Sequence, residues 1–166
     1  MQITTRSFDL NDCDFPEQLD PLLRRIYQSR GVTRFDHLNR QLSCLPKPGT
    51  MRGVCDAVER LVVAAKEKQA VTIVGDFDAD GATSSALMVL ALTAMGYTNV
   101  AFLVPNRFDY GYGLSPKIVD LAAQKTPDLI ITVDNGISSV EGVAHANSLG
   151  IDVIVTDHHL PGAILP

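Results

Sequence analysis

From about residue 71 onward, short apolar runs alternate with longer segments of helical periodicity. The apolar runs are rich in β-branched residues and short enough to be buried strands; they span 71–74, 100–104, 129–133 and 151–156. The intervening segments are predicted helices over 83–95, 115–124 and 138–149. Because parallel strands need long crossover connections, this alternation predicts an α/β fold. We expect a Rossmann-like open, mainly parallel sheet with helices on both faces.

The N-terminal third of the chain follows a different pattern. Residues 16–29 and 50–69 have helical periodicity, and the run Leu45-Pro46-Lys47-Pro48-Gly49 between them is rich in helix-breaking residues. The sequence therefore predicts an N-terminal helical extension over residues 1–49 and an α/β domain over residues 50–166.

Composition narrows the class of protein. A formal net charge of −5 at pH 7 disfavours nonspecific nucleic-acid binding through a basic surface. The three cysteines, Cys13, Cys44 and Cys55, show no C-x-x-C spacing, which favours reduced thiols over disulfides or a zinc site. The longest apolar stretch, 86–95, is about half the ~20 residues that a membrane-spanning helix needs. We expect a soluble, cytoplasmic protein.

Three polar turns fall at the ends of three predicted strands. They are Asp76-Phe77-Asp78-Ala79-Asp80-Gly81, Asp134-Asn135-Gly136 and Asp157-His158-His159. An open α/β sheet collects the C-terminal ends of its strands along one edge, where ligands bind. Carboxylates gathered there repel each other unless cations lie between them. The sequence therefore predicts a divalent metal site suited to phosphate chemistry.

In the first turn, Asp76 and Asp78 occupy alternate positions, with side chains ~6.5–7 Å apart in an extended chain. That spacing lets the two carboxylates bind different metals of a pair ~3.5–4 Å apart. Three other interpretations compete. The simplest is structural: one carboxylate caps the following helix and the other two are solvated. An EF-hand loop needs a glutamate where this chain has Leu87. A phosphatase with Asp76 as nucleophile leaves the histidines without a role.

The other two turns complete the predicted site. Asp134 is placed to bridge two metals. In the third turn, His158-His159, we assign one imidazole to a metal and the other to the substrate phosphate, because neighbouring side chains point in different directions. Asp157 is a typical orienting partner for a metal-binding histidine.

The loop after the second strand carries groups that recognise nucleotides. Arg107 suits bidentate binding of a phosphate, and Asn106 offers an amide beside it. Tyr110 or Tyr112 could stack on a base. Taken alone, such a loop would more often be mobile, with its aromatic side chains packed on the domain.

Together these motifs resemble those of the DHH phosphoesterase superfamily, and most closely its RecJ branch of single-stranded-DNA-specific exonucleases. The resemblance covers about residues 50–162 and rests on four motifs in order. These are 74–81, the pair 105–107 and 111–114, 133–138, and 157–159. By this resemblance residues 50–166 form a DHH-type phosphoesterase domain.

The resemblance implies metal-dependent hydrolysis of single-stranded DNA from its 5′ end, in recombination and repair. It implies a two-metal site for Mn²⁺ or Mg²⁺. The implied metal ligands are Asp76, Asp78, Asp134 and His158. The implied catalytic residues are Asp157, His159 and Arg107, and the implied substrate-binding residues are Asn106, Arg107, Tyr112 and His159.

Two departures from the family pattern matter. No histidine precedes the first acidic pair within residues 72–75, which favours the exonuclease branch over enzymes of pyrophosphate, cyclic dinucleotides or short oligonucleotides. RecJ-like chains also continue far beyond Pro166, with another metal-binding aspartate and a closing domain. We therefore expect an N-terminal fragment with an incomplete site, inactive alone. A non-catalytic nucleic-acid-binding module is the remaining alternative.

Overall fold

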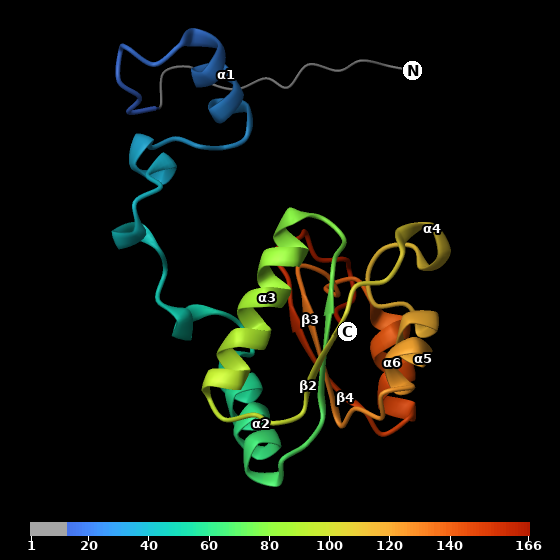
Figure 1. The fold of residues 1–166 in the computed structure, drawn as a ribbon. Coiled ribbons are helices and arrows are strands. Elements are labelled where there is room, and N and C mark those ends of the chain that lie inside the picture. Colours follow the sequence, from blue (N-terminus) through green and yellow to red (C-terminus); the bar gives the residue numbers. More distant parts are fainter. Residues whose placement is uncertain (1–12) are drawn as a thin grey trace. The chain divides into compact units, whose positions relative to one another are not determined.

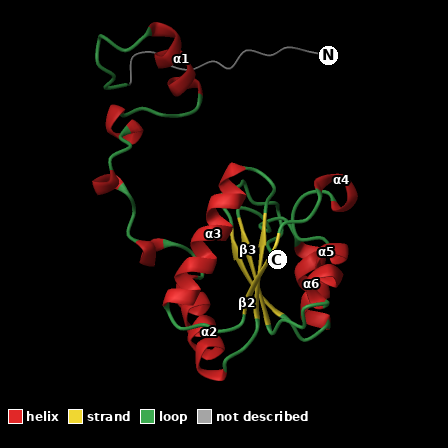
Figure 2. Ribbon diagram, viewed as in Figure 1, coloured by secondary structure: helices red, strands yellow, loops and turns green. Residues whose placement is uncertain are grey.

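The structure, a computed structural model, describes residues 13–166, apart from the side chain of Arg107 (Figures 1 and 2). The chain divides into two compact units, with the boundary between Met51 and Arg52. Within the described residues, no helix is both long and apolar enough to cross a membrane.

The first unit contains one α-helix, α1 (Pro21–Ser29), among its described residues. Asp20 caps this helix, because its Oδ1 accepts a hydrogen bond from the backbone N–H of Leu22 at 2.8 Å. Pro21 follows at the first helical position, so the helix begins later than residue 16, where the periodicity placed it. Three short 3₁₀ turns follow: η1 (Phe35–Leu38), η2 (Leu42–Cys44) and η3 (Pro48–Thr50).

The second unit is built on a four-stranded parallel sheet. Its strands are β1 (Val71–Gly75), β2 (Val100–Leu103), β3 (Leu129–Val133) and β4 (Asp152–Thr156), in the spatial order β2-β1-β3-β4. Val71 pairs with Val100 on one side and Leu129 on the other, and Leu129 pairs with Asp152. The predicted α/β fold with a parallel sheet is confirmed.

Helices cover both faces of this sheet (Figure 1). On one face lie α2 (Val54–Glu67) and α3 (Ala79–Ala94); on the other lie α5 (Pro116–Ala123) and α6 (Val140–Ser148). Each face has its own apolar core. The α2/α3 core includes Ala64, Ile73, Leu92 and Ile131, and the α5/α6 core includes Val74, Ile118, Ile130 and Ala146. A one-turn helix, α4 (Arg107–Tyr110), lies in the loop after β2.

The central strands β1 and β3 are buried along their whole length, whereas β2 and β4 are partly exposed at the sheet edges. After β1 the chain enters α3 on one face, and after β3 it leads to α6 on the other. Because the connections diverge, a crevice opens between the C-terminal ends of β1 and β3, the usual ligand site of open α/β sheets.

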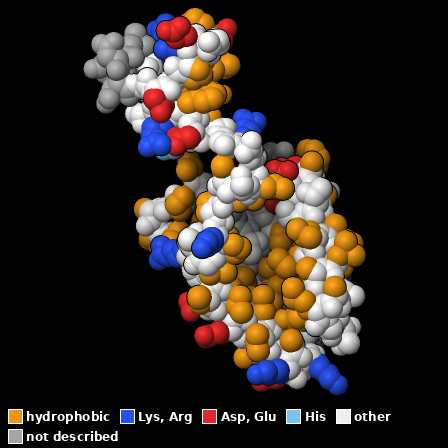
Figure 3. Space-filling view, turned by 90° about the vertical axis from the view of Figure 1, so that its left-hand side faces the viewer, with side chains coloured by type: hydrophobic (Ala, Val, Ile, Leu, Met, Phe, Trp, Pro, Cys, Tyr) orange, Lys and Arg blue, Asp and Glu red, His pale blue; other side chains and the backbone are white. Residues whose placement is uncertain are grey.

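Helix α3 differs from its prediction in two ways. It begins at Ala79 instead of residue 83, because Asp78 caps it. Its apolar sequence also indicates cover on most sides, and this is wrong for the described residues: Leu87 and Leu90 are 69% and 68% exposed. Figure 3 shows hydrophobic side chains gathered on this side of the unit, where Phe102 of β2 is also exposed.

Candidate metal centre

The sheet brings two of the predicted acidic turns together. Gly75 at the end of β1 pairs with Val133 at the end of β3, so Asp76 and Asp134 follow neighbouring strands in register. Carboxylate oxygens of Asp76, Asp78 and Asp134 lie within 4.8 Å of one another. Asp76 and Asp134 are buried, and Asp78 is exposed. Three carboxylates at this spacing repel one another, and a bound cation would offset that repulsion.

The first turn is fixed by the start of α3. Oδ1 of Asp76 accepts a hydrogen bond from the N–H of Phe77 at 2.8 Å, and Oδ1 of Asp78 accepts one from Gly81 at 2.9 Å. A Cβ on Gly81 would lie 2.3 Å from the carbonyl oxygen of Asp76, so only glycine permits this approach. Backbone donors thus hold one oxygen of each carboxylate. The second oxygen accepts no hydrogen bond from the described residues and can bind a cation.

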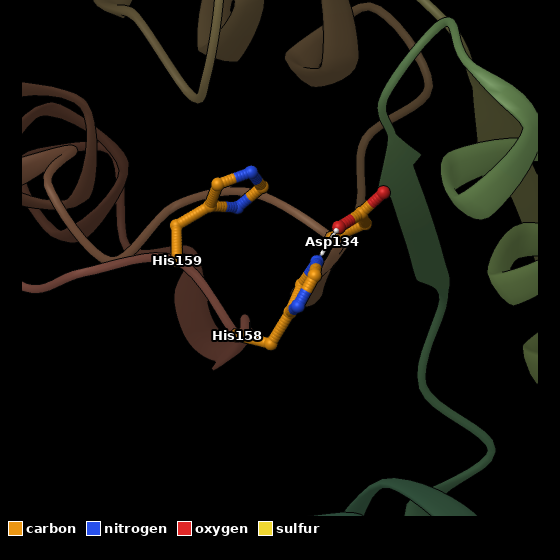
Figure 4. A group of neighbouring side chains, drawn as sticks. All are labelled: Asp134, His158 and His159. Atoms are coloured by element: carbon orange, nitrogen blue, oxygen red, sulfur yellow. Dashed lines mark ion pairs between the residues drawn. The ribbon is translucent and has the colours of Figure 1, made fainter. Parts of the chain in front are cut away.

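Asp134 carries two unfavourable features at once. Its φ of +62° is left-handed, which is uncommon for residues other than glycine and gathers at functional sites. Its Oδ1 is buried and lies 2.8 Å from Nε2 of His158, but no described residue gives it a well-aligned hydrogen bond. A buried carboxylate oxygen without a donor is costly unless a cation binds it. Figure 4 shows the His158 ring pointing at this carboxylate.

Asn135 ties the two central strands together, a role that the sequence did not reveal. Its Nδ2 donates to the carbonyl oxygen of Val74 at 3.1 Å and to that of Val133 at 2.9 Å. These bonds hold the ends of β1 and β3 at a fixed spacing. From the sequence, the Asp-Asn-Gly run signalled only a turn; the bond to Val74 depends on the strand order, which no local pattern indicates.

Asp157 links the turn after β4 to the turn after β3. Its side chain is 1% exposed. Oδ2 accepts from the N–H of Ile137 at 2.9 Å, and Oδ1 accepts from the N–H of His159 at 3.0 Å and lies 2.7 Å from that residue's Nδ1. Burial raises the pKa of Asp157, but the hydrogen bonds from Ile137 and His159 outweigh burial and hold the pKa below its ordinary value.

The two histidines lie side by side on this turn, with ring centroids 4.8 Å apart. Their nitrogens and a carboxylate oxygen of Asp134 lie within 4.8 Å of one another. The hydrogen bond to Asp157 raises the pKa of His159, burial opposes this, and the nearby carboxylates of Asp157, Asp134 and Asp76 add to the rise. Because Asp134 belongs to both groups of donors, the geometry brings together two adjoining sets of potential cation ligands that share one residue.

The loop after β2 contributes Tyr112. Its hydroxyl lies 3.3 Å from the carbonyl oxygen of Asp134 and 3.1 Å from Nδ1 of His159. Burial, followed by the charges of Asp157, Asp76, Asp134 and Asp78, raises the pKa of Tyr112 to about 12, so the hydroxyl keeps its proton at neutral pH.

Asn106, another predicted substrate-binding residue of this loop, makes its side-chain hydrogen bonds to described residues within the loop itself. Asn106 caps α4: its Oδ1 accepts from the N–H of Phe108 at 3.0 Å, and its Nδ2 donates to Asp109 at 2.8 Å. The side chain of Arg107 lies outside the described part of the structure. Placement of a phosphate by this pair remains a prediction.

A cleft of about 370 Å³ opens beside the metal-binding groups. It is lined by Asp80, Thr83, Ser84, Asp134, Thr156, Asp157 and His158. Its volume lies in the range of small-ligand sites. Thr83, Ser84 and Thr156 were not predicted as site residues. Thr83 and Ser84 line the cleft from the first turns of α3, which begins four residues earlier than its apolar pattern indicates, and Thr156 lines it from the end of β4.

Comparison with known proteins shows the family to which the chain belongs. The family profile described as "DHH family, N-terminal domain" matches residues 70–166. The chain belongs to the DHH family. It is 54% identical, over all 166 residues, to the single-stranded-DNA-specific exonuclease RecJ of Escherichia coli K12, and spans 29% of that protein. It is 40% identical to RecJ of Bacillus subtilis over 72% of the chain and 15% of the relative.

Two solved structures resemble this DHH domain. "Exonuclease RecJ bound to manganese" is 35% identical with a TM-score of 0.66, over 76% of this chain and 31% of the other. RecJ of Thermus thermophilus in complex with Mn²⁺ is 31% identical with a TM-score of 0.61. The match covers 86% of this chain and 20% of the other. The DHH chain thus spans less than a third of these relatives.

The donor set of this DHH domain fits hard divalent cations. Carboxylate oxygens suit Mg²⁺ and Mn²⁺, and imidazole nitrogen is also a ligand for transition metals. The buried Oδ1 of Asp134, which lacks a hydrogen bond, is the observation that calls for a cation here. No cysteine belongs to either group of donors, so a thiolate-rich zinc site is not formed by these residues.

Proposed function

We propose that a full-length protein carrying this DHH domain hydrolyses phosphodiester bonds of single-stranded DNA with two divalent cations, Mn²⁺ or Mg²⁺, from the 5′ end, and that residues 1–166 alone are inactive. The observation that carries the proposal is the buried carboxylate of Asp134, which belongs to both groups of potential metal ligands and whose Oδ1 lies 2.8 Å from Nε2 of His158 without a well-aligned hydrogen bond from the described residues. The similarity to RecJ exonucleases, two of them solved with manganese, supports the substrate and the cation.

In this proposal Asp76, Asp78, Asp134 and His158 hold the cations. When bound, the cations would neutralise charge that develops on the phosphate and make water a better nucleophile. The backbone bonds to the first two carboxylates keep their remaining oxygens directed at the cations. The side chain of His158 is exposed, and its Nε2 lies 2.8 Å from Oδ1 of Asp134. The ring can therefore change its orientation to suit the cation.

His159 and Asp157 act on the substrate. The Asp157 carboxylate accepts a hydrogen bond from the Nδ1–H of His159, which leaves Nε2 as the ring nitrogen that faces a phosphate oxygen. The raised pKa of His159 favours the imidazolium, which donates from Nε2 to that oxygen and stabilises its negative charge. Arg107 and Asn106 would bind a second phosphate, and Tyr112 lines the path of the strand.

The biological setting of the proposal is DNA recombination and repair in the cytoplasm. It is supported by the similarity to RecJ proteins and by three cysteines without disulfide partners.

The decisive variant is Asp134→Asn, which keeps the size of the side chain and removes its charge. We expect Mn²⁺ binding to this chain, measured by calorimetry, to be lost, and the hydrolysis rate of a full-length protein carrying it to fall about 10³-fold or more, since several kcal/mol of transition-state stabilisation come from the cations. Asp120→Asn is the matched control, because this exposed carboxylate lies outside the candidate site and, among the described residues, forms an ion pair with His145 alone.

Near-normal nuclease activity of Asp134→Asn would remove Asp134 from the mechanism. A substrate panel completes the test, since long single strands should be degraded faster than dinucleotides. Preference for dinucleotides or pyrophosphate would instead assign the domain to small phosphate compounds.

A further inference from the structure

The serine at the start of α6 makes an unusual hydrogen bond. Ser139 is the N-cap residue of this helix, a position where a serine side chain usually accepts from backbone N–H groups of the first turn. Within the described residues it makes no such bond. Its Oγ accepts instead from the N–H of Leu114, 25 residues earlier in the chain, at 3.0 Å. The hydroxyl therefore joins the loop after β2 to the segment after β3.

The first turn of α6 contacts the same loop residue so closely that no side chain would fit between them. A Cβ on Gly142 would lie 1.7 Å from the carbonyl oxygen of Leu114. Gly113 has a φ of +78°, and a Cβ there would lie 3.0 Å from Oγ of Ser139. Leu114 itself is buried in the α5/α6 core. We call the contacts of Leu114 with Ser139 and Gly142 the loop–α6 contact.

The loop–α6 contact lies at the end of a loop that reaches the candidate metal centre. This loop begins at β2, an edge strand that the sheet supports on one side only. Two residues before Leu114, the hydroxyl of Tyr112 lies 3.3 Å from the carbonyl oxygen of Asp134. The same loop contains Asn106 and Arg107, the predicted phosphate-binding residues. Its place beside Asp134 therefore depends on how its far end is held against α6.

We propose that Ser139 and Gly142 are positioning residues, which hold the loop of residues 105–113 beside the Asp134 turn and so set where the DNA strand binds. The hydroxyl satisfies the N–H of Leu114, which would otherwise be buried without an acceptor. The carboxylates of Asp76 and Asp78 have their own backbone bonds, so loosening the loop should weaken substrate binding and spare cation binding. The effect on DNA rests on the proposed function; the effect on the loop does not.

The first test needs neither DNA nor metal. Ser139→Ala removes the acceptor of the Leu114 N–H, so amide hydrogen exchange at Leu114 in a ¹⁵N-labelled chain should accelerate about tenfold, as expected for the loss of one hydrogen bond. Exchange in the central strand β3 should not change. Ser148→Ala is the matched control, because it removes a hydroxyl that donates to the carbonyl oxygen of His145 at 2.7 Å, at the other end of α6. Unchanged exchange at Leu114 would overturn the proposal. Equal acceleration throughout β3 would also overturn it, since that result means general destabilisation.

The second test separates substrate positioning from cation binding in a full-length protein that carries this chain. Ser139→Ala should raise KM for single-stranded DNA about tenfold, with kcat and Mn²⁺ affinity within about twofold of the unmodified protein. Ser139→Thr keeps an accepting hydroxyl and should retain the original KM. Gly142→Ala displaces Leu114 and should raise KM further if the variant folds, as judged by circular dichroism; Ser139→Ala decides the test without it.

An unchanged KM in Ser139→Ala, or a Ser139→Thr variant that behaves like Ser139→Ala, would contradict a positioning role for the hydroxyl. Loss of Mn²⁺ affinity in Ser139→Ala would contradict the separation of the loop from the cation ligands. A parent protein without nuclease activity would overturn the proposed function and leave the hydrogen-exchange result standing.

Discussion

The candidate metal centre has two halves that are held in different ways. The carboxylate half, Asp76, Asp78 and Asp134, follows the central strands β1 and β3, which are buried along their whole length. The imidazole half, His158 and His159, follows β4, a partly exposed strand at the sheet edge. The side chains differ accordingly: those of His158 and His159 are 71% and 48% exposed, whereas that of Asp134 is 5% exposed.

The difference indicates which half determines where the cations lie. Backbone groups fix the carboxylate half, through Phe77, Gly81 and the bond from the N–H of Asp134 to Thr156. The imidazole half depends mainly on side chains, above all on Asp157. Charged groups that repel each other need rigid support, because any freedom would let them separate. The two imidazoles do not repel one another in this way, so they tolerate more freedom and can adapt to the cation and the substrate.

The largest expected effect of perturbing one half comes from Gly81→Ala. Its Cβ would lie 2.3 Å from the carbonyl oxygen of Asp76 and push the start of α3 away from β1. We expect the free energy of unfolding to fall by about 1–3 kcal/mol, as for overpacking in a core. Mn²⁺ affinity, measured by calorimetry, should fall as the carboxylates separate. Gly49→Ala is the control, since a Cβ there meets open space. Equal Mn²⁺ affinity in both variants would contradict a rigid carboxylate half.

A smaller effect is expected from Asp157→Asn, which perturbs the imidazole half alone. The amide keeps the size of the carboxylate and can still accept from Ile137, but it loses the charge that orients His159. Hydrolysis by a full-length protein should fall about 10–100-fold, as for other partners that orient metal-site residues. Mn²⁺ bound at the carboxylate half should remain, measured by paramagnetic resonance. Loss of that signal would show that the two halves are one unit.

The smallest effect concerns pH in the metal-free chain. The pKa of His159 is raised, so its stabilising contribution is present below about 6.5 and is lost as pH rises through its folded value above 6.5. The pKa of Asp157 is lowered, so its contribution is present above about 3.8 and is lost as pH falls through its folded value below 3.8.

The Asp157–His159 pair therefore stabilises the fold most between these two values. Chemical unfolding at a series of pH values, with chelator present, measures the effect. His159→Gln should flatten the decline above 6.5. An unchanged decline in that variant would assign it to other groups.

Much of the fold follows from local pattern. The runs 71–74 and 129–133 are apolar and β-branched because they form the buried centre of the sheet, and this made them easy to predict. The spatial order β2-β1-β3-β4 was not predicted, because strand order depends on the path of the crossovers. The exposed apolar face of α3 was missed for a related reason: apolar sequence indicates a preference for burial and does not supply the surface that covers it.

Some features of the candidate site could also be predicted from local pattern, and others could not. The polar turns were visible because ionisable residues directly after buried strands are unusual, and the structure places Asp76, Asp78 and Asp134 together. Their role as ligands remains a prediction. The bridge made by Asn135 and the hydroxyl contacts of Tyr112 depend on groups far apart in sequence, so no local pattern could indicate them.

The most direct measurement is anomalous diffraction from crystals of this chain soaked in Mn²⁺. The account predicts a peak among the carboxylate oxygens of Asp76, Asp78 and Asp134, with a neighbouring peak within reach of His158. Strong manganese peaks only elsewhere, such as at the exposed Asp120 and His145, or the absence of a peak beside Asp134 at saturating Mn²⁺, would contradict it.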